Sequence, residues 1–268
     1  MSRIRNHLIA SLALLGAVTA SGAASAQSAI IALVGDNNVA LINPSSMKVM
    51  SSMPIKGVKK LSGFDVRPAD GMLYGLTDTG WIVTIDPKTG AVTQKAELST
   101  KPEAGATVSV DFNPVADKMR VITNTGQNLR VNVDDGKVTV DGELKFAESD
   151  MHKGEKPNIV GAAYTNSWKG TKETALYDID ATIGALFKQA PPNDGILSAV
   201  GKLGFKVTGP IAFNIVSESE GQNAAWLVHA GTVYSVDLST GAAKEVGKLN
   251  VNGPVRDIAW WAGSPKSM

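Results

Sequence analysis

The sequence predicts an all-β protein, a single β-propeller of five four-stranded blades. Three observations lead to this prediction. Turn motifs recur at intervals of 43, 46, 59 and 46 residues, a period typical of stacked repeats. Apolar and polar residues alternate with period two between the turns, and no segment has helical spacing. Finally, the chain ends in a strand without a unit of its own, which offers a way to close the ring.

A turn between the third and fourth strands marks each predicted unit. Asp or Asn can cap such a turn with its side chain, Pro presets φ, and Gly accepts the left-handed conformation. The turns are Asn43–Met47, Asp86–Gly90, Val133–Gly136, Pro191–Gly195 and Asp237–Gly241. We attribute the one long interval, 59 residues, to an insertion at Ser167–Glu173 between the first two strands of its unit.

The predicted strands between these turns are rich in β-branched and aromatic residues. Innermost strands are expected at 63–68, 110–114, 161–166, 211–215 and 257–261. Second strands are expected at 29–35, 72–77, 118–123, 174–179 and 224–229, and third strands at 39–43, 81–86, 128–133, 184–189 and 232–237. Fourth strands follow the turns, and two of them contain the repeated sequence VGKL, at 200–203 and 246–249.

The two ends of the mature chain are expected to pair with each other. Asp257–Trp261 has the pattern of an innermost strand with no unit after it, whereas Ala29 begins directly with a second strand. Pairing these segments completes the fifth blade and removes free sheet edges. The alternatives, an open β-sandwich or two small β domains, are less well supported because no Pro-, Gly- or Ser-rich linker divides the chain.

Residues 1–26 are expected to be a signal peptide, followed by a propeller domain over residues 27–268. Arg3 and Arg5 precede the apolar run Leu8–Ala20, and the small residues 24–26 offer a cleavage site. The run is too short to cross a bilayer as a helix. We therefore expect an exported protein, periplasmic or extracellular, with no integral membrane segment in its mature chain; an uncleaved anchor is the alternative.

Composition narrows the partners and the chemistry. The mature chain has 24 basic and 25 acidic residues, a balance that does not favour nucleic acid or an anionic membrane as a partner. The absence of cysteine excludes disulfides and thiolate metal sites. Because only His152 and His229 follow residue 26, neither a multi-imidazole metal site nor a Ser–His hydrolytic centre is favoured. We expect no resident cofactor or metal.

Several long motifs lie between Gly63 and Gly204. They are Gly63–Tyr74, Val110–Val121, Asn124–Arg130, Ala162–Asn166 and Pro191–Gly195. In these motifs the chain resembles a bacterial family, the domain of unknown function 4394. The resemblance implies an exported β-repeat protein. It assigns no catalytic or binding residue, because the family has no established activity.

The first candidate site consists of Asp65 and Asp111, which share a register in adjacent innermost strands and are expected to face the channel. Three interpretations remain open. Arg67, Arg120 or backbone amides can satisfy the carboxylates in blade-to-blade hydrogen bonds. Alternatively, the pair binds a hard cation such as calcium, or it acts in general acid–base catalysis. The matching positions of the other three innermost strands are Ala163, Ala212 and Ala259.

The second candidate site is a set of polar loops between second and third strands, at 78–80, 124–128 and 180–182. We expect these loops to share a face with the openings of the innermost strands, where amide groups can bind sugars or peptides. Turn formation explains the same residue types. The ligand-binding candidates are Asp65, Arg67, Asp111, Asn124, Gln127, Asn128 and Asp180. Trp81 and Trp168 are candidates for stacking on a sugar, whereas Trp226, Trp260 and Trp261 are expected to pack between blades.

These observations predict an exported, non-enzymatic propeller that binds or scaffolds an unknown small molecule, glycan or protein. The alternative is a propeller hydrolase of the glycoside or lactone class that uses the channel carboxylates. Its catalytic pair would face an open channel with carboxyl groups about 5–10 Å apart. A subunit of an extracellular assembly is a third interpretation, which requires a contiguous apolar surface patch.

Overall fold

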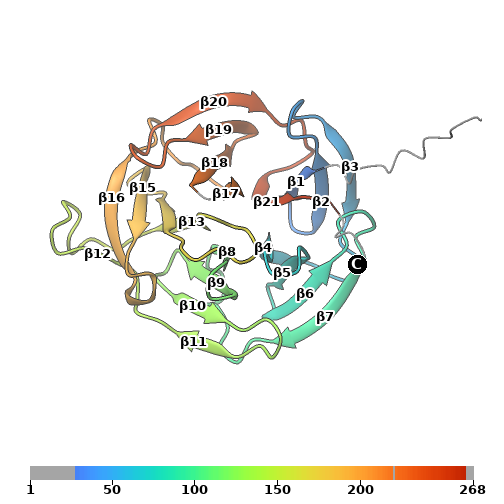
Figure 1. Ribbon diagram of the computed structural model, residues 1–268, viewed down its shortest axis with the longest axis horizontal. Helices are drawn as coiled ribbons and strands as arrows, with labels where there is room; N and C mark the ends of the chain where they lie inside the picture. The colour runs from blue at the N-terminus through green and yellow to red at the C-terminus, as the bar shows by residue number, and fades with distance from the viewer. Residues whose placement is uncertain (1–27, 220, 264–268) are drawn as a thin grey trace, which may run out of the picture.

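The computed structural model describes residues 28–219 and 221–263, which form five small sheets arranged in a ring (Figure 1). The innermost strand of each sheet lies near the central channel and the outermost strand at the rim. The predicted five-bladed propeller is therefore confirmed. The expected signal peptide, residues 1–26, lies outside the described residues.

Each blade is described from its innermost strand outward. Blade 1 contains β21 (Val255–Trp261), β1 (Ala29–Val34), β2 (Asn38–Ile42) and β3 (Val49–Pro54). Blade 2 contains β4 (Leu61–Val66), β5 (Leu73–Thr77), β6 (Trp81–Ile85) and β7 (Val92–Glu97). Blade 3 contains β8 (Val108–Asn113), β9 (Lys118–Thr123), β10 (Asn128–Val131) and β11 (Val138–Val140). Blade 4 contains β13 (Ile159–Tyr164), β14 (Leu176–Asp180), β15 (Ala185–Gln189), β16 (Ile196–Lys202) and the short outer strand β12 (Lys145–Phe146). Blade 5 contains β17 (Ile211–Ser219), β18 (Gln222–His229), β19 (Thr232–Val236) and β20 (Ala243–Lys248).

Ring closure occurs where the sequence predicts it, in blade 1. The C-terminal strand β21 pairs antiparallel with β1, with Ile258 opposite Ala32 and Ala259 opposite Ile31. On its other sides β21 contacts β4 of blade 2 and β17 of blade 5. The last strand of the chain therefore occupies the innermost position of the first blade.

Five buried apolar clusters fill the five interfaces between neighbouring blades. The period-two pattern explains how one strand serves two interfaces, because alternate side chains point to opposite faces of a sheet. In β1, Ile31 and Leu33 pack toward blade 2, whereas Ile30 and Ala32 pack toward blade 5. A unit cannot bury either face alone, and the repeat is therefore a consequence of packing.

The glycine at the end of four of the five turns permits a close approach to the preceding blade. A Cβ atom on Gly90 would lie 2.3 Å from the Pro54 carbonyl oxygen, and one on Gly136 would lie 2.0 Å from that of Glu97. Both glycines have positive φ values, 67° and 73°, which side chains disfavour. In blade 1 the corresponding turn residue is Met47, which adopts a φ of 54°.

The predicted insertion accounts for only part of the long interval in blade 4. It lies, as expected, in the loop between β13 and β14. A second additional segment, 145–158, lies between blade 3 and β13, and it contains β12, which pairs in parallel with β16. The turn at Pro191–Gly195 also contains a short 3-10 helix, η1 (Pro192–Asp194).

We expect Ile258→Ala to destabilise the protein by about 2–5 kcal/mol, because it leaves a cavity in the closing strand. Ile258 is 3% exposed, whereas Val246 on the outer strand β20 is 45% exposed. Val246→Ala is the matched control and should change the free energy of unfolding by less than about 0.5 kcal/mol. Urea denaturation measures both values, and equal losses would contradict the role assigned to β21.

Candidate functional site

The innermost strands run side by side around the channel, so that their first residues meet at one end. A cavity of about 780 Å³, which we call the mouth cleft, opens there. Each blade contributes a residue from its innermost strand: Arg256, Ser62, Val108, Val160 and Ile211. The cleft is therefore a joint product of all five blades.

Loops between second and third strands complete the mouth cleft. Asp78, Asn124 and Ala181, one from each of the three predicted polar loops, all line it. These loops thus share a face with the openings of the innermost strands. Of the predicted ligand-binding residues, Asn124 alone lines the cleft.

Asn124 and Gln127 hold the loop between β7 and β8, which forms one side of the cleft. The Thr107 N–H donates to Asn124 Oδ1 at 2.8 Å, and the Asn124 N–H donates back to the Thr107 carbonyl at 3.0 Å. The Glu103 N–H donates to Gln127 Oε1 at 2.7 Å. These contacts place Glu103 and Thr107 in the lining of the cleft.

In blade 4, Asp180 likewise holds a neighbouring loop in place through hydrogen bonds to its backbone. Its fully buried carboxylate accepts hydrogen bonds from the N–H groups of Asn158, at 2.7 Å, and Ile183, at 2.8 Å. The Asn158 side chain lines the cleft, and its Nδ2 atom donates to Thr182 Oγ1 at 3.0 Å. Asp180 therefore positions a lining residue and is not itself at the surface of the cleft.

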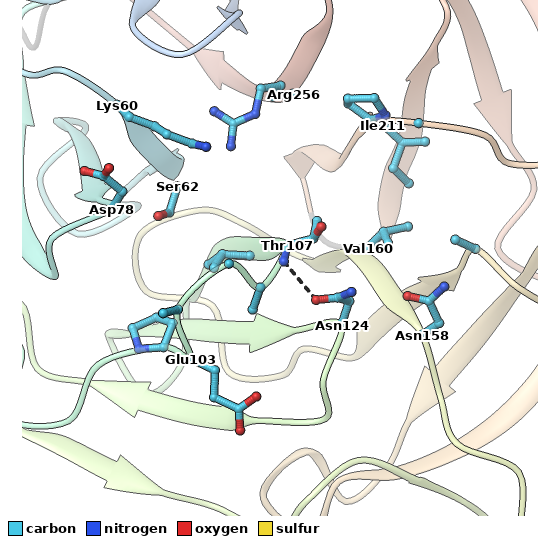
Figure 2. A pocket seen from close by; sticks show the side chains of 18 of the residues that line it. Lys60, Ser62, Asp78, Glu103, Thr107, Asn124, Asn158, Val160, Ile211 and Arg256 are labelled. Atoms are coloured by element: carbon cyan, nitrogen blue, oxygen red, sulfur yellow. Dashed lines mark hydrogen bonds between the residues drawn. The ribbon is translucent and has the colours of Figure 1, made fainter.

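The walls of the mouth cleft differ in character, as Figure 2 shows. Lys60, Arg256 and Asp78 lie on one side, and the apolar side chains of Val160 and Ile211 lie on the other. Lys60 and Arg256 both lie near the Asp36 carboxylate, at 3.8 and 3.7 Å. Arg256 Nη1 is fixed by the Leu61 carbonyl at 2.8 Å.

Inside the channel, carboxylates bridge successive blades. Asp257 Oδ2 accepts the Phe64 N–H at 2.8 Å, and Asp65 Oδ2 accepts the Phe112 N–H at 2.9 Å. Asp111 Oδ1 accepts the N–H of Tyr164 at 3.0 Å. The structure thus brings Asp65 and Asp111 together as predicted. Their hydrogen-bond partners in the next blade are backbone amides, and not Arg67 or Arg120.

Asn214 and Asp257 were not among the predicted site residues. Asn214 Nδ2 donates to the Ile258 carbonyl at 3.0 Å and to Asp65 Oδ1 at 3.3 Å, which joins blade 5 to blades 1 and 2. Room for Asp257 depends on Gly63, because a Cβ atom there would lie 2.9 Å from Asp257 Oδ2. That glycine and the acid in the closing strand were the available sequence signals.

Burial alters the ionisation of this carboxylate cluster. It raises the pKa of Asp65 to about 7, even though hydrogen bonds from Phe112 and Asn214 favour the charged form. Burial raises the pKa of Asp111 well above its usual range, and the Asp65 charge adds to the effect. Burial likewise raises the pKa of Asp257, again with a contribution from Asp65.

Arg67 lies at the far end of the channel, away from the mouth cleft. Its Nε atom donates to Asp117 Oδ1 at 2.8 Å, and Nη1 lies 3.3 Å from both Asp70 Oδ2 and Tyr74 Oη. The Asp117 hydrogen bond is the main cause of the raised pKa of the guanidinium. Arg67 therefore ties the β4–β5 loop to the β8–β9 loop.

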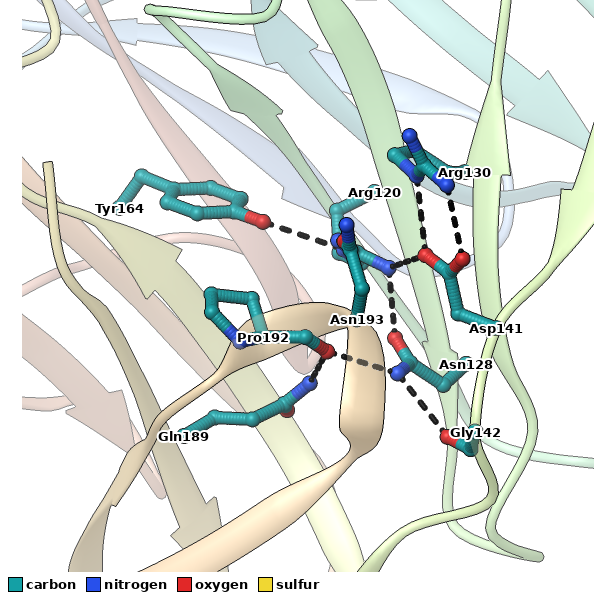
Figure 3. A network of polar contacts seen from close by, with 9 residues as sticks. All are labelled: Arg120, Asn128, Arg130, Asp141, Gly142, Tyr164, Gln189, Pro192 and Asn193. Carbon is teal, nitrogen blue, oxygen red and sulfur yellow. Dashed lines mark hydrogen bonds and ion pairs between the residues drawn. The ribbon is translucent and has the colours of Figure 1, made fainter.

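Arg120 and Asn128 form a buried polar network between blades 3 and 4 (Figure 3). The guanidinium donates to Asn128, Asp141, Asn193 and Tyr164 at 2.7–3.1 Å. Asn128 is 1% exposed, so this candidate faces the interior and not a ligand. Burial alone would raise the pKa of Asp141, but hydrogen bonds from Arg130 and Arg120 hold it below its usual value.

Residues 28–219 and 221–263 offer neither a metal-binding cluster nor a membrane-spanning helix. No group of three or more His, Cys, Asp and Glu side chains has an arrangement that could hold a metal ion. These residues also contain no helix with the length and apolar character needed to span a membrane.

The model of a protein family described as Domain of unknown function (DUF4394) matches residues 38–259. No curated protein matches the chain significantly. Among solved structures, a protein of unknown function from Bacteroides thetaiotaomicron is 17% identical, with a TM-score of 0.53 over 90% of this chain and 66% of that chain.

Two auxiliary nutrient binding proteins are also among the solved structures that match the chain. The one from Bacteroides thetaiotaomicron is 13% identical, with a TM-score of 0.48 over 82% of this chain and 59% of its own. The one from Bacteroides ovatus is 12% identical, with a TM-score of 0.46 over 74% of this chain and 56% of its own. The chain thus spans less than two thirds of the length of all three structures.

Arg120→Met should destabilise the protein by about 3–5 kcal/mol, because it leaves buried acceptors unpaired. Arg130→Met is the matched control, since both arginines pair with Asp141 but the Arg130 side chain is 32% exposed and that of Arg120 only 1%. We expect the control to cost less than about 1 kcal/mol. Similar costs in chemical denaturation would contradict a structural role specific to Arg120.

Stability should fall as the pH rises from 4 to 7. Because the folded-state pKa of Asp65 is about 7 and its ordinary value is 3.8, the unfolded state loses the proton first. Asp65 alone then removes about 3 kcal/mol over this range. Asp65→Asn should reduce the slope of the profile measured by denaturation at each pH, whereas Asp194→Asn, at an exposed position, should leave it unchanged. A profile that rises through this range would refute the assignment.

Proposed function

The chain belongs to the family described as Domain of unknown function (DUF4394), and we propose that this protein is an exported, non-enzymatic propeller that binds its ligand in the mouth cleft. One observation carries the proposal. The cleft gathers side chains from all five blades on fixed strand ends. A concave site with a few convergent polar groups on a rigid frame is the usual form of a small-molecule site.

The loops around the mouth cleft support a preorganised binding site. The 103–107 loop is hydrogen-bonded to Asn124 and Gln127, and Asn158 is held by Asp180. A site that is ordered before the ligand arrives loses less conformational entropy on binding. The polar side with Lys60 and Arg256 and the apolar side with Val160 and Ile211 fit an amphipathic small molecule or a peptide segment.

The hydrolase alternative has one observation in its favour, the pKa of about 7 for Asp65, which suits a general acid or base. However, both oxygens of Asp65 already accept hydrogen bonds from Phe112 and Asn214. Asp65, Asp111 and Asp257 are also absent from the lining of the mouth cleft. Asp65 alone of the three lines the cavity at the opposite end of the channel, without Asp111 or Asp257 beside it. A pair of catalytic carboxyl groups therefore does not face either cavity, which favours binding over hydrolysis.

Scaffolding of a large assembly has less support. The exposed large apolar side chains of the described chain are Val49, Met50, Met72, Val115, Val140, Met151 and Val246. They are distributed over segments of several blades and not gathered on one strand or loop. A docking surface for a protein partner usually requires a contiguous apolar patch.

The proposal is tested by thermal-shift screening of the purified protein against peptides, organic acids and glycans. A bound ligand at a hundred times its dissociation constant should stabilise the protein by about 2.7 kcal/mol. Lys60→Ala should at least halve the shift, because Lys60 lines the cleft. Lys95→Ala, on the exposed face of β7, is the control and should retain it. The proposal would be overturned if no compound shifted the melting temperature, or if a ligand shifted it equally in Lys60→Ala and Lys95→Ala.

A further inference from the structure

A second cavity, of about 460 Å³, opens at the opposite end of the channel. We call it the far-end pocket. Its lining includes Asp65 and Asn214 from the channel interior together with Trp168 and Trp260. Residues toward the C-terminal ends of three innermost strands line it: Val66 of β4, Ser217 of β17 and Trp260 of β21. The polar cluster in the channel therefore separates it from the mouth cleft.

The buried polar groups of the far-end pocket are hydrogen-bond acceptors. Asn214 is 6% exposed and donates from Nδ2 to Asp65 and to the Ile258 carbonyl. None of the described residues donates a hydrogen bond to its Oδ1 atom. The Asp65 carboxylate accepts hydrogen bonds from Phe112, Asn214 and Val66, whereas a carboxylate can accept about four in all. A ligand that supplies hydroxyl donors satisfies both groups.

The charged side chains of the far-end pocket do not favour an anion. The Arg67 guanidinium is paired with Asp117 and Asp70. Lys169 lies exposed in the lining and is the other basic side chain there. An anionic ligand would have to approach the Asp65 carboxyl directly. A neutral ligand with several hydroxyl groups avoids this repulsion.

The insertion in blade 4 holds Trp168 against the pocket. Asn166 has a φ of 57°, and its backbone N–H donates to Asn223 Oδ1 at 2.8 Å. Asn223 Nδ2 donates in return to Asn166 Oδ1 at 3.1 Å, and the Trp168 N–H donates to the Asn166 carbonyl at 2.8 Å. The insertion is thereby anchored to β18 of blade 5. This anchoring fixes the backbone at Trp168, a partly exposed residue in the lining of the pocket.

Trp260, on the closing strand β21, is the second tryptophan in the lining of the far-end pocket. We expected it to pack between blades, and it does contact the apolar cluster of blades 1 and 5. However, it is only partly buried, and it also lines the far-end pocket. Aromatic rings supply a large apolar contact area for the C–H faces of a sugar, while acceptor oxygens bind its hydroxyls.

We propose that the far-end pocket is a second binding site, distinct from the mouth cleft, for a neutral polyhydroxylated ring such as a monosaccharide unit. Trp168 and Trp260 contact the apolar face of the ring. Asp65 and Asn214 accept hydrogen bonds from its hydroxyl groups. The insertion that distinguishes blade 4 thereby gains a function, the placement of Trp168.

The test is titration of the purified protein with glucose, galactose, mannose, N-acetylglucosamine and maltose, followed by tryptophan fluorescence and calorimetry. At least one sugar should bind saturably. Trp168→Ala should weaken its affinity at least tenfold, whereas Trp168→Phe should retain most of it. Trp81→Ala is the control because Trp81 is also partly exposed but lies outside the pocket. Asp65→Asn should weaken binding as well, with circular dichroism verifying the fold of each variant.

Three results would overturn this inference. The first is the absence of saturable binding for every sugar. The second is unchanged affinity in Trp168→Ala. The third is saturable binding of tetramethylammonium in place of the sugars, which would identify a cation site. Lys60→Ala, in the mouth cleft, should leave sugar binding unchanged. The proposal for the far-end pocket can therefore fail independently of the proposal for the mouth cleft.

Discussion

The pairing of β21 with β1 is the interaction on which the rest of the structure depends. Without it, β1 would present an open edge and the innermost position of blade 1 would be empty. An unpaired edge of that kind favours intermolecular association. Because β21 also contacts β4 and β17, the same strand completes the wall of the channel and supplies Asp257 to its interior. The strand that closes the ring therefore also contributes to both cavities, through Arg256 in the mouth cleft and Trp260 in the far-end pocket.

The polar cluster of the channel extends this closure from strand to strand. Asp257, Asp65 and Asp111 each accept a backbone N–H from the next blade, and Asn214 returns the connection from blade 5 to blade 1. These hydrogen bonds favour the charged carboxylate, but burial has the larger effect and raises the pKa values of all three carboxyl groups. The cluster thus holds the ring together and divides the channel into two separate ends.

Local signals predicted most of the fold. The turn glycines and the period-two strands follow from backbone conformation and packing, which act over a few residues. Asp65 and Asp111 were predicted as a pair because they share a register. The residue that aligns with them in the closing strand is Ala259, and Asp257 was missed because it lies two positions earlier. The register between β1 and β21 also shifts at Leu33 and Val34. An ungapped comparison of strands cannot detect such a shift.

The candidate site was harder to predict because its residues act through distant partners. Gln127 and Asp180 have the composition of ligand-binding loops, yet they bind the backbone at Glu103 and Asn158. Only the folded ring brings Lys60, Asn158 and Arg256 to one cleft. No motif links these three segments in the sequence, so tertiary structure alone reveals the cleft.

The interface between blades 3 and 4 shows why a buried polar network persists where apolar packing would suffice. Asp178 is fully buried, and neither of its carboxyl oxygens has a hydrogen-bond partner among the described residues. Burial raises its pKa well above the usual range, and the nearby Arg120 charge does not reverse the effect. Such groups are costly for stability. In a ring of similar repeats, however, polar networks that differ from one interface to the next oppose pairing of the wrong blades. We therefore interpret Arg120 and its partners as a determinant of blade order, which lowers the free energy of unfolding relative to an apolar interface.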